Sequence, residues 1–136
     1  MSQQENLRII HEAFAAWNAH DADRYAALLD EGYVEETNTR RTPVRGREGA
    51  RAAMQEHFRV MPDLHFDLDV MITSGDQVFT RWLVTGTYRG ELRSRLSSGL
   101  QLEEYGCTLS KLGEGGIIHV WHYWETDHLL RHVAAQ

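Results

Sequence analysis

The hydrophobic periodicity of this chain changes once, at Pro62, and that change constrains its fold more than any other feature. Before Pro62, apolar residues such as Leu7, Ile10 and Phe14 recur at steps of three and four, which is typical of one face of an α-helix. After it, apolar and polar residues alternate through residues 65–72, which is typical of a β-strand with one apolar face. The order of these patterns predicts helices first and a sheet afterwards.

The part before Pro62 predicts three helices. The first covers about residues 2–20 and begins at Ser2-Gln3-Gln4-Glu5, a capping box that can satisfy free backbone amides of the first turn. The second follows Asp21, carries Tyr25, Leu28 and Leu29, and ends near Gly32; the third covers about residues 47–60. Between these two helices, Tyr33-Val34 predicts a short strand and residues 37–46 predict a loop.

The part after Pro62 predicts four long strands joined by tight connections. They cover residues 65–72, 77–89, 100–112 and 117–124, and residues 127–133 could form a short closing helix. Strands with short links pair antiparallel. The pattern therefore predicts an α+β domain in which helices cover one face of a long, coiled sheet. A curved sheet closed by helices leaves a concavity, where a small ligand would bind.

Composition and charge limit the classes of partner. A length of 136 residues fits one domain over residues 1–136, with 42% hydrophobic and 25% charged residues. The net charge of −6 disfavours binding of nucleic acid, and no apolar run is long enough to cross a membrane. The N-terminus lacks the pattern of a signal peptide, and Cys107 is the sole cysteine, so we expect a cytoplasmic location.

Six segments, spread in order over nearly the whole chain, form a recognisable series. They are Phe14-Ala15-Ala16-Trp17-Asn18-Ala19-His20-Asp21, Gly46-Arg47-Glu48-Gly49, Met61-Pro62-Asp63-Leu64-His65, Val84-Thr85-Gly86-Thr87-Tyr88-Arg89-Gly90-Glu91, the pair Gly99 and Gly106, and Trp121-His122-Tyr123-Trp124-Glu125 followed by Leu129-Leu130. Together they resemble the SnoaL-like polyketide cyclase branch of the nuclear-transport-factor-2-like superfamily.

The resemblance implies a cone-like curved antiparallel sheet packed against three N-terminal helices, a fold also called cystatin-like. It further implies a homodimer packed through its sheets and no cofactor. Characterised enzymes of this kind include cyclases that close a ring in polyketide methyl esters by an intramolecular aldol step. Other members of the superfamily are isomerases, dehydratases, epoxide hydrolases or binding domains, so the fold alone does not fix the function.

The closing segment supplies the first candidate for catalysis. Glu125 matches the position of the aspartate that acts as general acid and base in the resembling cyclases. A carboxylate in an apolar pocket can fill that role if burial raises its pKa, and Trp121 and Tyr123 would supply such surroundings. Asp127 is the alternative acid, although an N-cap of the closing helix also explains it.

A second group of candidates lies where the helices give way to strands. Glu36 falls where SnoaL-like proteins often carry a pocket histidine, and Glu35 beside it must point to the opposite side of a strand. Asn38 could orient a substrate through its amide. His65 lies on the polar face of its strand, where it faces either the pocket or solvent and a dimer partner.

Aromatic residues complete the predicted pocket. Trp17 and Trp82 are candidates for its wall, and Tyr105 could line the cavity from a strand. No metal site is expected, because His119 and His122 are three apart on a strand and so lie on opposite faces.

Two hypotheses of function remain open at this point. The first is a cofactor-independent cyclase or isomerase that acts on a small hydrophobic carbonyl compound by acid–base catalysis. The second is a non-catalytic domain of the same fold that binds a small molecule or serves as an accessory. A homodimer is expected in either case, because the outer sheet face is broad and mixes polar and aromatic residues, namely Arg81, Thr85, Arg89, Gln101, Glu103 and Tyr105.

Overall fold

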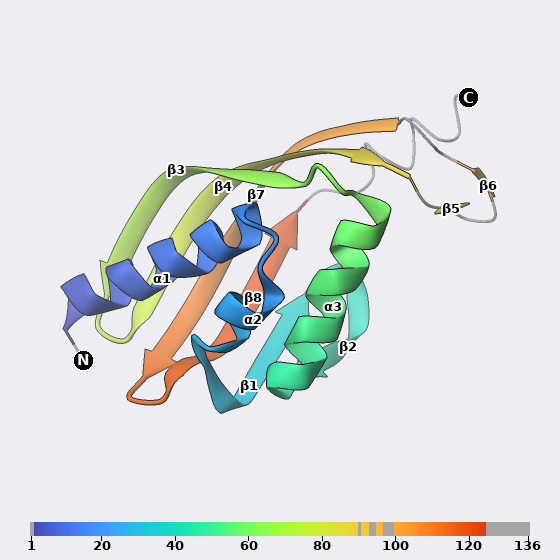
Figure 1. Cartoon of the computed structure of the whole chain (residues 1–136). Helices are drawn as coiled ribbons and strands as arrows, with labels where there is room; N and C mark the ends of the chain where they lie inside the picture. The colour runs from blue at the N-terminus through green and yellow to red at the C-terminus, as the bar shows by residue number, and fades with distance from the viewer. Residues whose placement is uncertain (1, 90, 93–94, 97–99, 125–136) are drawn as a thin grey trace.

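The computed structural model describes residues 2–89, 91–92, 95–96 and 100–124, with side chains described for 2–89 and 101–124. Within these residues the chain forms three helices and eight strands, and the three helices and the five expected strands follow the predicted order (Figure 1). They are α1 (Gln3–Asn18), α2 (Ala22–Ala26), β1 (Leu29–Thr37), β2 (Arg40–Arg45), α3 (Gly46–Val60), β3 (His65–Ser74), β4 (Gln77–Tyr88), β5 (Glu91–Leu92), β6 (Arg95–Leu96), β7 (Leu100–Gly113) and β8 (Gly116–Trp124).

Six strands form one curved sheet in the order β2-β1-β8-β7-β4-β3, and β5 and β6 form a separate small pair. Neighbours in the large sheet pair antiparallel except β1 and β8, which run parallel. The antiparallel pairs follow from the short connections between successive strands. The parallel pair brings residues 34–37 beside residues 119–122, two segments far apart in the sequence.

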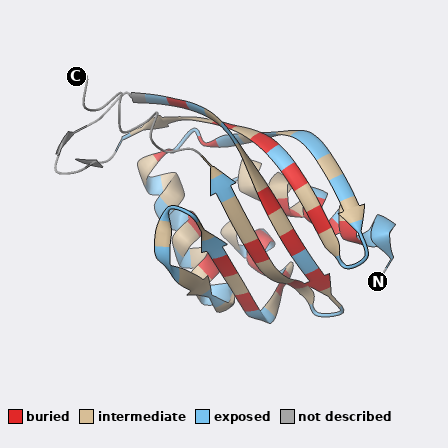
Figure 2. Cartoon of the chain, turned by 180° about the vertical axis from the view of Figure 1, so that it is seen from behind, coloured by how far each residue is buried: buried red, intermediate tan, exposed pale blue. Residues whose placement is uncertain are grey.

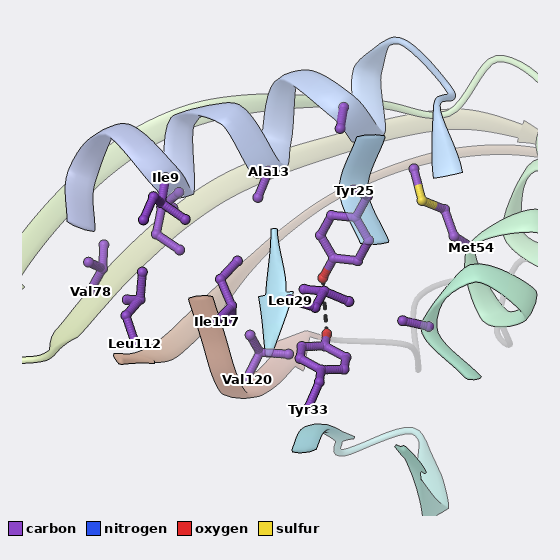
Figure 3. Close-up of a cluster of buried hydrophobic side chains, with 13 residues drawn as sticks. Ile9, Ala13, Tyr25, Leu29, Tyr33, Met54, Val78, Leu112, Ile117 and Val120 are labelled. Atoms are coloured by element: carbon purple, nitrogen blue, oxygen red, sulfur yellow. Dashed lines mark hydrogen bonds between the residues drawn. The ribbon is translucent and has the colours of Figure 1, made fainter. Parts of the chain in front are cut away.

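All three helices cover one face of the sheet, as Figure 1 shows. Ser2 caps α1 by accepting a hydrogen bond from the Glu5 amide at 3.0 Å, which confirms the predicted start of this helix. The main core lies between the helices and the concave sheet face (Figure 3). Its buried members come from every layer and include Ile10, Ala13, Tyr25, Leu29, Tyr33, Met54, Val78, Ile117 and Val120.

The alternation predicted for the first long strand breaks at Asp69. Leu68 pairs with Trp82 and Val70 pairs with Arg81, so the backbone of Asp69 has no opposite residue on β4 and forms a β-bulge. Beyond a bulge the faces exchange, and Val70 and Ile72 are 38% and 57% exposed. The prediction that they share the inner face with Phe66 and Leu68 is therefore wrong. Figure 2 shows buried and exposed residues alternating along the strands from the convex side.

Two other local predictions also need correction. Leu28 and Leu29 do not belong to the second helix, because α2 ends at Ala26 and β1 begins at Leu29. The predicted loop over residues 37–46 contains strand β2, which pairs with β1 to form a hairpin. Central strands disfavour proline because it has no amide hydrogen to donate, but β2 is an edge strand, where proline is tolerated. The predicted closing helix lies outside the described residues.

Within the described part of the chain, none of the helices combines the length and the apolar character that a membrane span requires.

Candidate active site

A cavity of about 120 Å³ lies between the helices and the concave face of the sheet. For comparison, an apolar cavity of roughly 150 Å³ holds a benzene molecule. Most of the lining is apolar and comes from α1, from the residues just after α3, and from the inward side chains of the long strands: Ile10, Ala13, Phe14, Trp17, Met61, Leu64, Phe66, Trp82, Val84, Leu102, Ile117, Val120 and Trp124. The polar members are Tyr25, Glu35, Thr37, Thr39, Arg40, His57, Thr108, Ser110 and His122.

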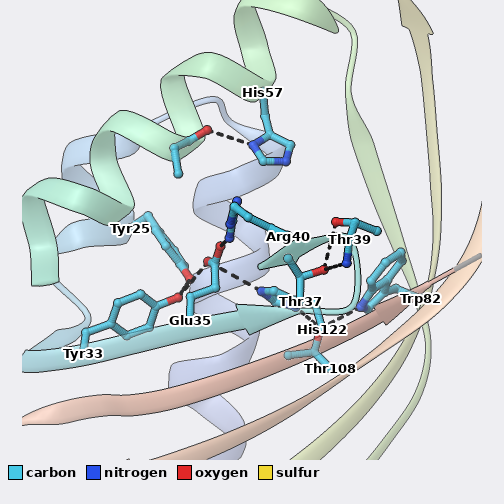
Figure 4. Close-up of polar contacts among 11 residues, drawn as sticks. Tyr25, Tyr33, Glu35, Thr37, Thr39, Arg40, His57, Trp82, Thr108 and His122 are labelled. Atoms are coloured by element: carbon cyan, nitrogen blue, oxygen red, sulfur yellow. Dashed lines mark hydrogen bonds and ion pairs between the residues drawn. The ribbon is translucent and has the colours of Figure 1, made fainter. Parts of the chain in front are cut away.

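Glu35 is the centre of the polar part of this lining (Figure 4). Its side chain points inward from β1 and the residue is 6% exposed. One carboxylate oxygen accepts a hydrogen bond from the Tyr33 hydroxyl at 3.0 Å and lies 3.6 Å from Nε2 of His122. The other oxygen accepts a hydrogen bond from the Arg40 guanidinium at 2.8 Å. The buried carboxylate is thus held between a cation, a hydroxyl and an imidazole.

The charge on Glu35 is stable at neutral pH. Burial alone would raise the pKa of this carboxyl, but hydrogen bonds and attraction from His122, with hydrogen bonds from Arg40 and Tyr33, outweigh it and lower the pKa to about 2. A group with so low a pKa does not exchange protons with a substrate near neutral pH. Glu35 is therefore suited to orienting its partners and to stabilising positive charge on them.

Two tyrosine hydroxyls, those of Tyr33 and of the cavity-lining Tyr25, extend the network around Glu35. Burial raises the pKa of Tyr25 and of Tyr33, and the neighbouring Glu35 carboxylate raises both further. Both hydroxyls therefore stay protonated. Because Tyr33 donates its hydrogen to Glu35, the 3.0 Å contact between the two hydroxyls must use the hydrogen of Tyr25.

His122 is held from both sides. Its Nδ1 lies 2.7 Å from the Thr108 hydroxyl, which also accepts a hydrogen bond from the indole N–H of Trp82 at 2.9 Å. Indole can only donate, so the Thr108 hydrogen is free to point at Nδ1 of His122. In that arrangement Nε2 carries the hydrogen that faces Glu35. The ring is thus fixed by groups from β1, β4 and β7.

Comparison with known proteins agrees with this architecture. The sequence model of the SnoaL-like polyketide cyclase family matches residues 8–133. The chain belongs to the SnoaL-like polyketide cyclase family.

Solved structures support the fold of this SnoaL-like chain. A candidate SnoaL-like polyketide cyclase from Jannaschia sp. CCS1 superposes with a TM-score of 0.88 at 19% identity, over 98% of this chain and 94% of that one. TsrD from Streptomyces laurentii gives a TM-score of 0.83 at 21% identity, over 100% and 99% of the two chains. IdmH, a candidate polyketide cyclase from Streptomyces antibioticus, gives a TM-score of 0.81 at 22% identity, over 95% of this chain and 98% of that one. Among proteins with curated functions, none matches the sequence.

Two of the aromatic residues that were expected in the pocket wall lie at the cavity of this SnoaL-like protein. Trp17 and Trp82 line the cavity, as the sequence predicted for its wall, and Trp124 lines it at the end of β8. Glu125 and Asp127, the two predicted acids, lie outside the described residues. Their assignment as the acid–base group stays a prediction.

The prediction for Glu36 is corrected in favour of its neighbour. Glu36 points to the convex side of β1, where its half-exposed carboxylate lies 2.7 Å from Nε2 of His119. Successive side chains of a strand point to opposite faces, so Glu35 takes the inward position. The sequence did hold a signal for the inward position of Glu35. Tyr33 lies two residues before it on the strand and so shares its face, and this large aromatic side chain is fully buried.

Four other predicted residues point away from the cavity. Tyr105 and Tyr123 are 51% and 52% exposed, and the Trp121 ring stacks on His119 on the convex side. The half-exposed His65 ring contacts Asp67 at 3.2 Å rather than the cavity. These are corrections with one cause: on each strand the inward register belongs to the neighbouring residue.

Asn38 also has a structural role in place of the predicted contact with a substrate. Its amide nitrogen donates to the Trp124 carbonyl at 2.8 Å, and its amide oxygen accepts from the Trp124 backbone N–H at 3.2 Å. This side chain therefore ties the end of β1 to the end of β8, beside the cavity-lining Trp124.

The polar residues that do meet in the cavity were missed by the sequence analysis. They are Glu35, Arg40, Thr108 and His122, from four strands. His122 shares its face with Val120 and Trp124, but a register shift between Lys111 and Leu112 in the neighbouring strand decides which face is inward. Arg40 was missed because its segment was predicted to be a loop, so no face of a strand was assigned to its side chain.

Proposed function

We propose that this protein is a cofactor-independent enzyme that catalyses proton transfer on a small hydrophobic carbonyl compound, in the manner of a polyketide cyclase or isomerase. The observation that carries the proposal is the ion pair of Glu35 and Arg40, with His122 beside it, within a cavity whose lining is mostly apolar. Burying charged groups is costly, and a purely structural cavity wall would be cheaper to build from apolar side chains. Perturbed ionisable groups in a cavity are a physical indication of catalysis.

The arrangement suits the charge that such a reaction develops. Removing a proton beside a carbonyl places negative charge on the carbonyl oxygen as an enolate. Arg40 offers hydrogen-bond donors at the cavity, and its buried Nε has no partner among the residues that the structure describes. An unpaired buried donor costs about 1–3 kcal/mol, which an oxygen of the bound substrate would recover. We therefore assign Arg40 to the substrate oxygen, with Glu35 holding the guanidinium in place.

Glu125 remains part of the proposal as the group that delivers or removes the second proton. It follows Trp124, whose side chain lines the cavity, and it matches the acid–base position of the resembling cyclases. An aldol or isomerase reaction needs both removal and delivery of a proton. Replacing Glu125 with Gln keeps the size of the side chain and removes its acidity, so turnover should fall by at least about a hundredfold.

Exchange of α-hydrogens in heavy water tests the proposal without knowledge of the natural substrate. Acetophenone and cyclohexanone carry one ring and an acidic α-position, and proton NMR follows the loss of their α-hydrogen signals. The protein should accelerate this exchange over buffer. Glu125→Gln should lose the acceleration, and Glu36→Gln, altered on the convex face, should keep it. Unchanged exchange with Glu125→Gln would remove Glu125 from the mechanism.

A binding measurement with the same two ketones separates an enzyme from a non-catalytic binding domain. Saturation-transfer NMR detects whether either ketone binds. Binding of both ketones with no exchange above buffer would overturn the proposed chemistry and favour the non-catalytic domain.

We also propose a homodimer that associates through the convex face of the sheet. Four large hydrophobic or aromatic residues of this face are exposed in the single chain, namely Val70, Ile72, Tyr105 and Tyr123. Exposed apolar groups that cluster on one face are typical of protein–protein contacts. Val70 and Ile72 were not part of the surface expected from the sequence, and the bulge at Asp69 adds them to it.

A further inference from the structure

Proton transfer needs an atom with a free lone pair that faces the substrate, and most candidates in the cavity are already occupied. Both oxygens of Glu35 accept hydrogen bonds, and the pKa of this carboxyl is lowered to about 2. Both ring nitrogens of His122 face protein groups, Thr108 on one side and Glu35 on the other. The guanidinium of Arg40 has only donors. None of these three side chains offers a free basic atom.

His57 is different. It projects from α3 toward the polar group on the sheet, as Figure 4 shows, and it lines the cavity. Its Nδ1 lies 2.8 Å from the backbone carbonyl of Ala53. A carbonyl can only accept a hydrogen bond, so Nδ1 must carry the hydrogen. In the neutral ring, Nε2 is then the atom with the lone pair. Nε2 has no hydrogen-bond partner in the described part of the chain.

The surroundings of His57 keep its ring in one orientation. The ring meets Trp17 edge-on at a centroid distance of 5.7 Å and an angle of 85°. The contact with Ala53, one turn earlier on the same helix, fixes the ring from the other side. A base that is held by a backbone carbonyl and a packed indole needs little reorganisation when a substrate arrives.

We propose that Nε2 of His57 is the atom that accepts the proton from the substrate. This inference rests on the proposed function and adds a residue that neither the sequence motifs nor the family resemblance indicated. A C–H bond beside the carbonyl breaks, its electron pair becomes the enolate, and Nε2 gains the proton to form an imidazolium. At the end of the reaction the imidazolium gives the proton back, or Glu125 delivers one. In the second case the imidazolium releases its proton to water and Glu125 takes one up from water, so that both groups return to their starting states. His57 thus works from the helix side and Arg40 from the sheet side.

Phenol and anisole provide a test that needs no turnover. Both are single rings, but phenol donates a hydrogen bond and its methyl ether does not. A hydrogen bond to Nε2 should make phenol bind about fivefold more tightly than anisole, which corresponds to about 1 kcal/mol. His57→Phe keeps a ring against Trp17 and removes the acceptor, so the preference for phenol should vanish. His57→Gln, which retains an acceptor oxygen, should restore part of it.

Three measurements separate the loss of the acceptor atom from a general effect of the substitution. His11 is an exposed histidine on α1, so His11→Gln should keep the full preference for phenol and serves as the matched control. Thermal unfolding shows whether His57→Phe is folded at the temperature of the titration. Nitrogen-15 NMR of labelled histidine then reads the tautomer directly: phenol should shift Nε2 of His57 while Nδ1 stays protonated.

The outcomes for His57 and for the proposed function are distinguishable. An Nε2-protonated tautomer, or an equal preference for phenol in folded His57→Phe, would overturn the inference. Exchange of the α-hydrogens of the ketones that persists in His57→Phe would also overturn the inference, and it would leave the proposed function standing. Wild-type protein that prefers phenol through His57 but exchanges no ketone hydrogens would overturn the proposed function and keep His57 as the ligand's hydrogen-bond acceptor.

Discussion

The two faces of the curved sheet are built from the same strands, yet they treat ionisable groups in opposite ways. Glu35 and Glu36 are neighbours on β1 and each lies near a histidine of β8. On the concave face, Glu35 is 6% exposed and its pKa is lowered to about 2. On the convex face, Glu36 and His119 form a pair that is open to water, where ion pairs contribute little.

This difference shows that the strength of a charge interaction in this protein depends on whether helices cover the residues that make it. The helices exclude water from the concave face, so charges there interact strongly and must be paired. The convex face keeps charged and aromatic groups at the surface, where Arg81 pairs with Asp69 and lies 4.1 Å over the Tyr105 ring. That face is suited to contact with a partner, and the concave face to contact with a substrate.

Paired substitutions at the two glutamates give the largest contrast. Glu35→Gln leaves Arg40 and His122 without their buried anion, so the free energy of unfolding near pH 7 should fall by about 3 kcal/mol. The drop in the pKa of Glu35 from 4.5 to about 2 gives a similar value at ~1.4 kcal/mol per pH unit. Glu36→Gln should cost less than about 0.5 kcal/mol. Urea denaturation of the three proteins measures both changes.

The pH dependence of that contrast has a definite sign. The folded state lowers the pKa of Glu35, so its stabilisation is fully present above about pH 4.5 and is lost as the pH falls toward 2. The gap in stability between the wild type and Glu35→Gln should therefore shrink between about pH 4.5 and pH 2. A gap that stays constant through this window would contradict the low pKa.

Two glycines of the concave face allow a second test of its packing. A Cβ on Gly106 would overlap the ring of Trp82 and lie 2.8 Å from the Cβ of Trp124. Gly106→Ala should therefore displace the indole that bonds to Thr108 and cost about 2 kcal/mol in unfolding free energy. Gly86→Ala is the control, because its nearest neighbour would be the Met61 sulfur at an ordinary 3.4 Å. Equal stability of the two variants would show that Trp82 has room to move.

The smallest effect on the folded chain is expected on the convex face. Ile72 is 57% exposed, so Ile72→Lys should change the stability of the monomer by less than about 0.5 kcal/mol. The same change should weaken the proposed dimer at least about tenfold, because it places charge in the contact. Sedimentation velocity at micromolar concentration measures this, with His11→Lys on the helix side as control. A wild type that sediments as a monomer would contradict the dimer.

Particular residues show how far sequence reasoning reached. The step from helical to strand periodicity at Pro62 predicted the order of the elements. Trp17 and Trp82, which were expected in the pocket wall, line the cavity, and their contact with a substrate stays a prediction. The choice between Glu35 and Glu36 failed although the alternation rule was sound. A rule of period two states that neighbours face opposite ways, but it does not state which one faces inward.

The sequence by itself determined the order of the three helices and of the four long strands, because periodicity and turn chemistry act over a few residues. It also determined the family, through motifs spread along nearly the whole chain. Only the tertiary structure decided the site. The bulge at Asp69, the register shift beside Leu112 and the parallel pairing of β1 with β8 set which side chains face the helices. These depend on contacts between distant segments, and a shift of one residue exchanges the two faces.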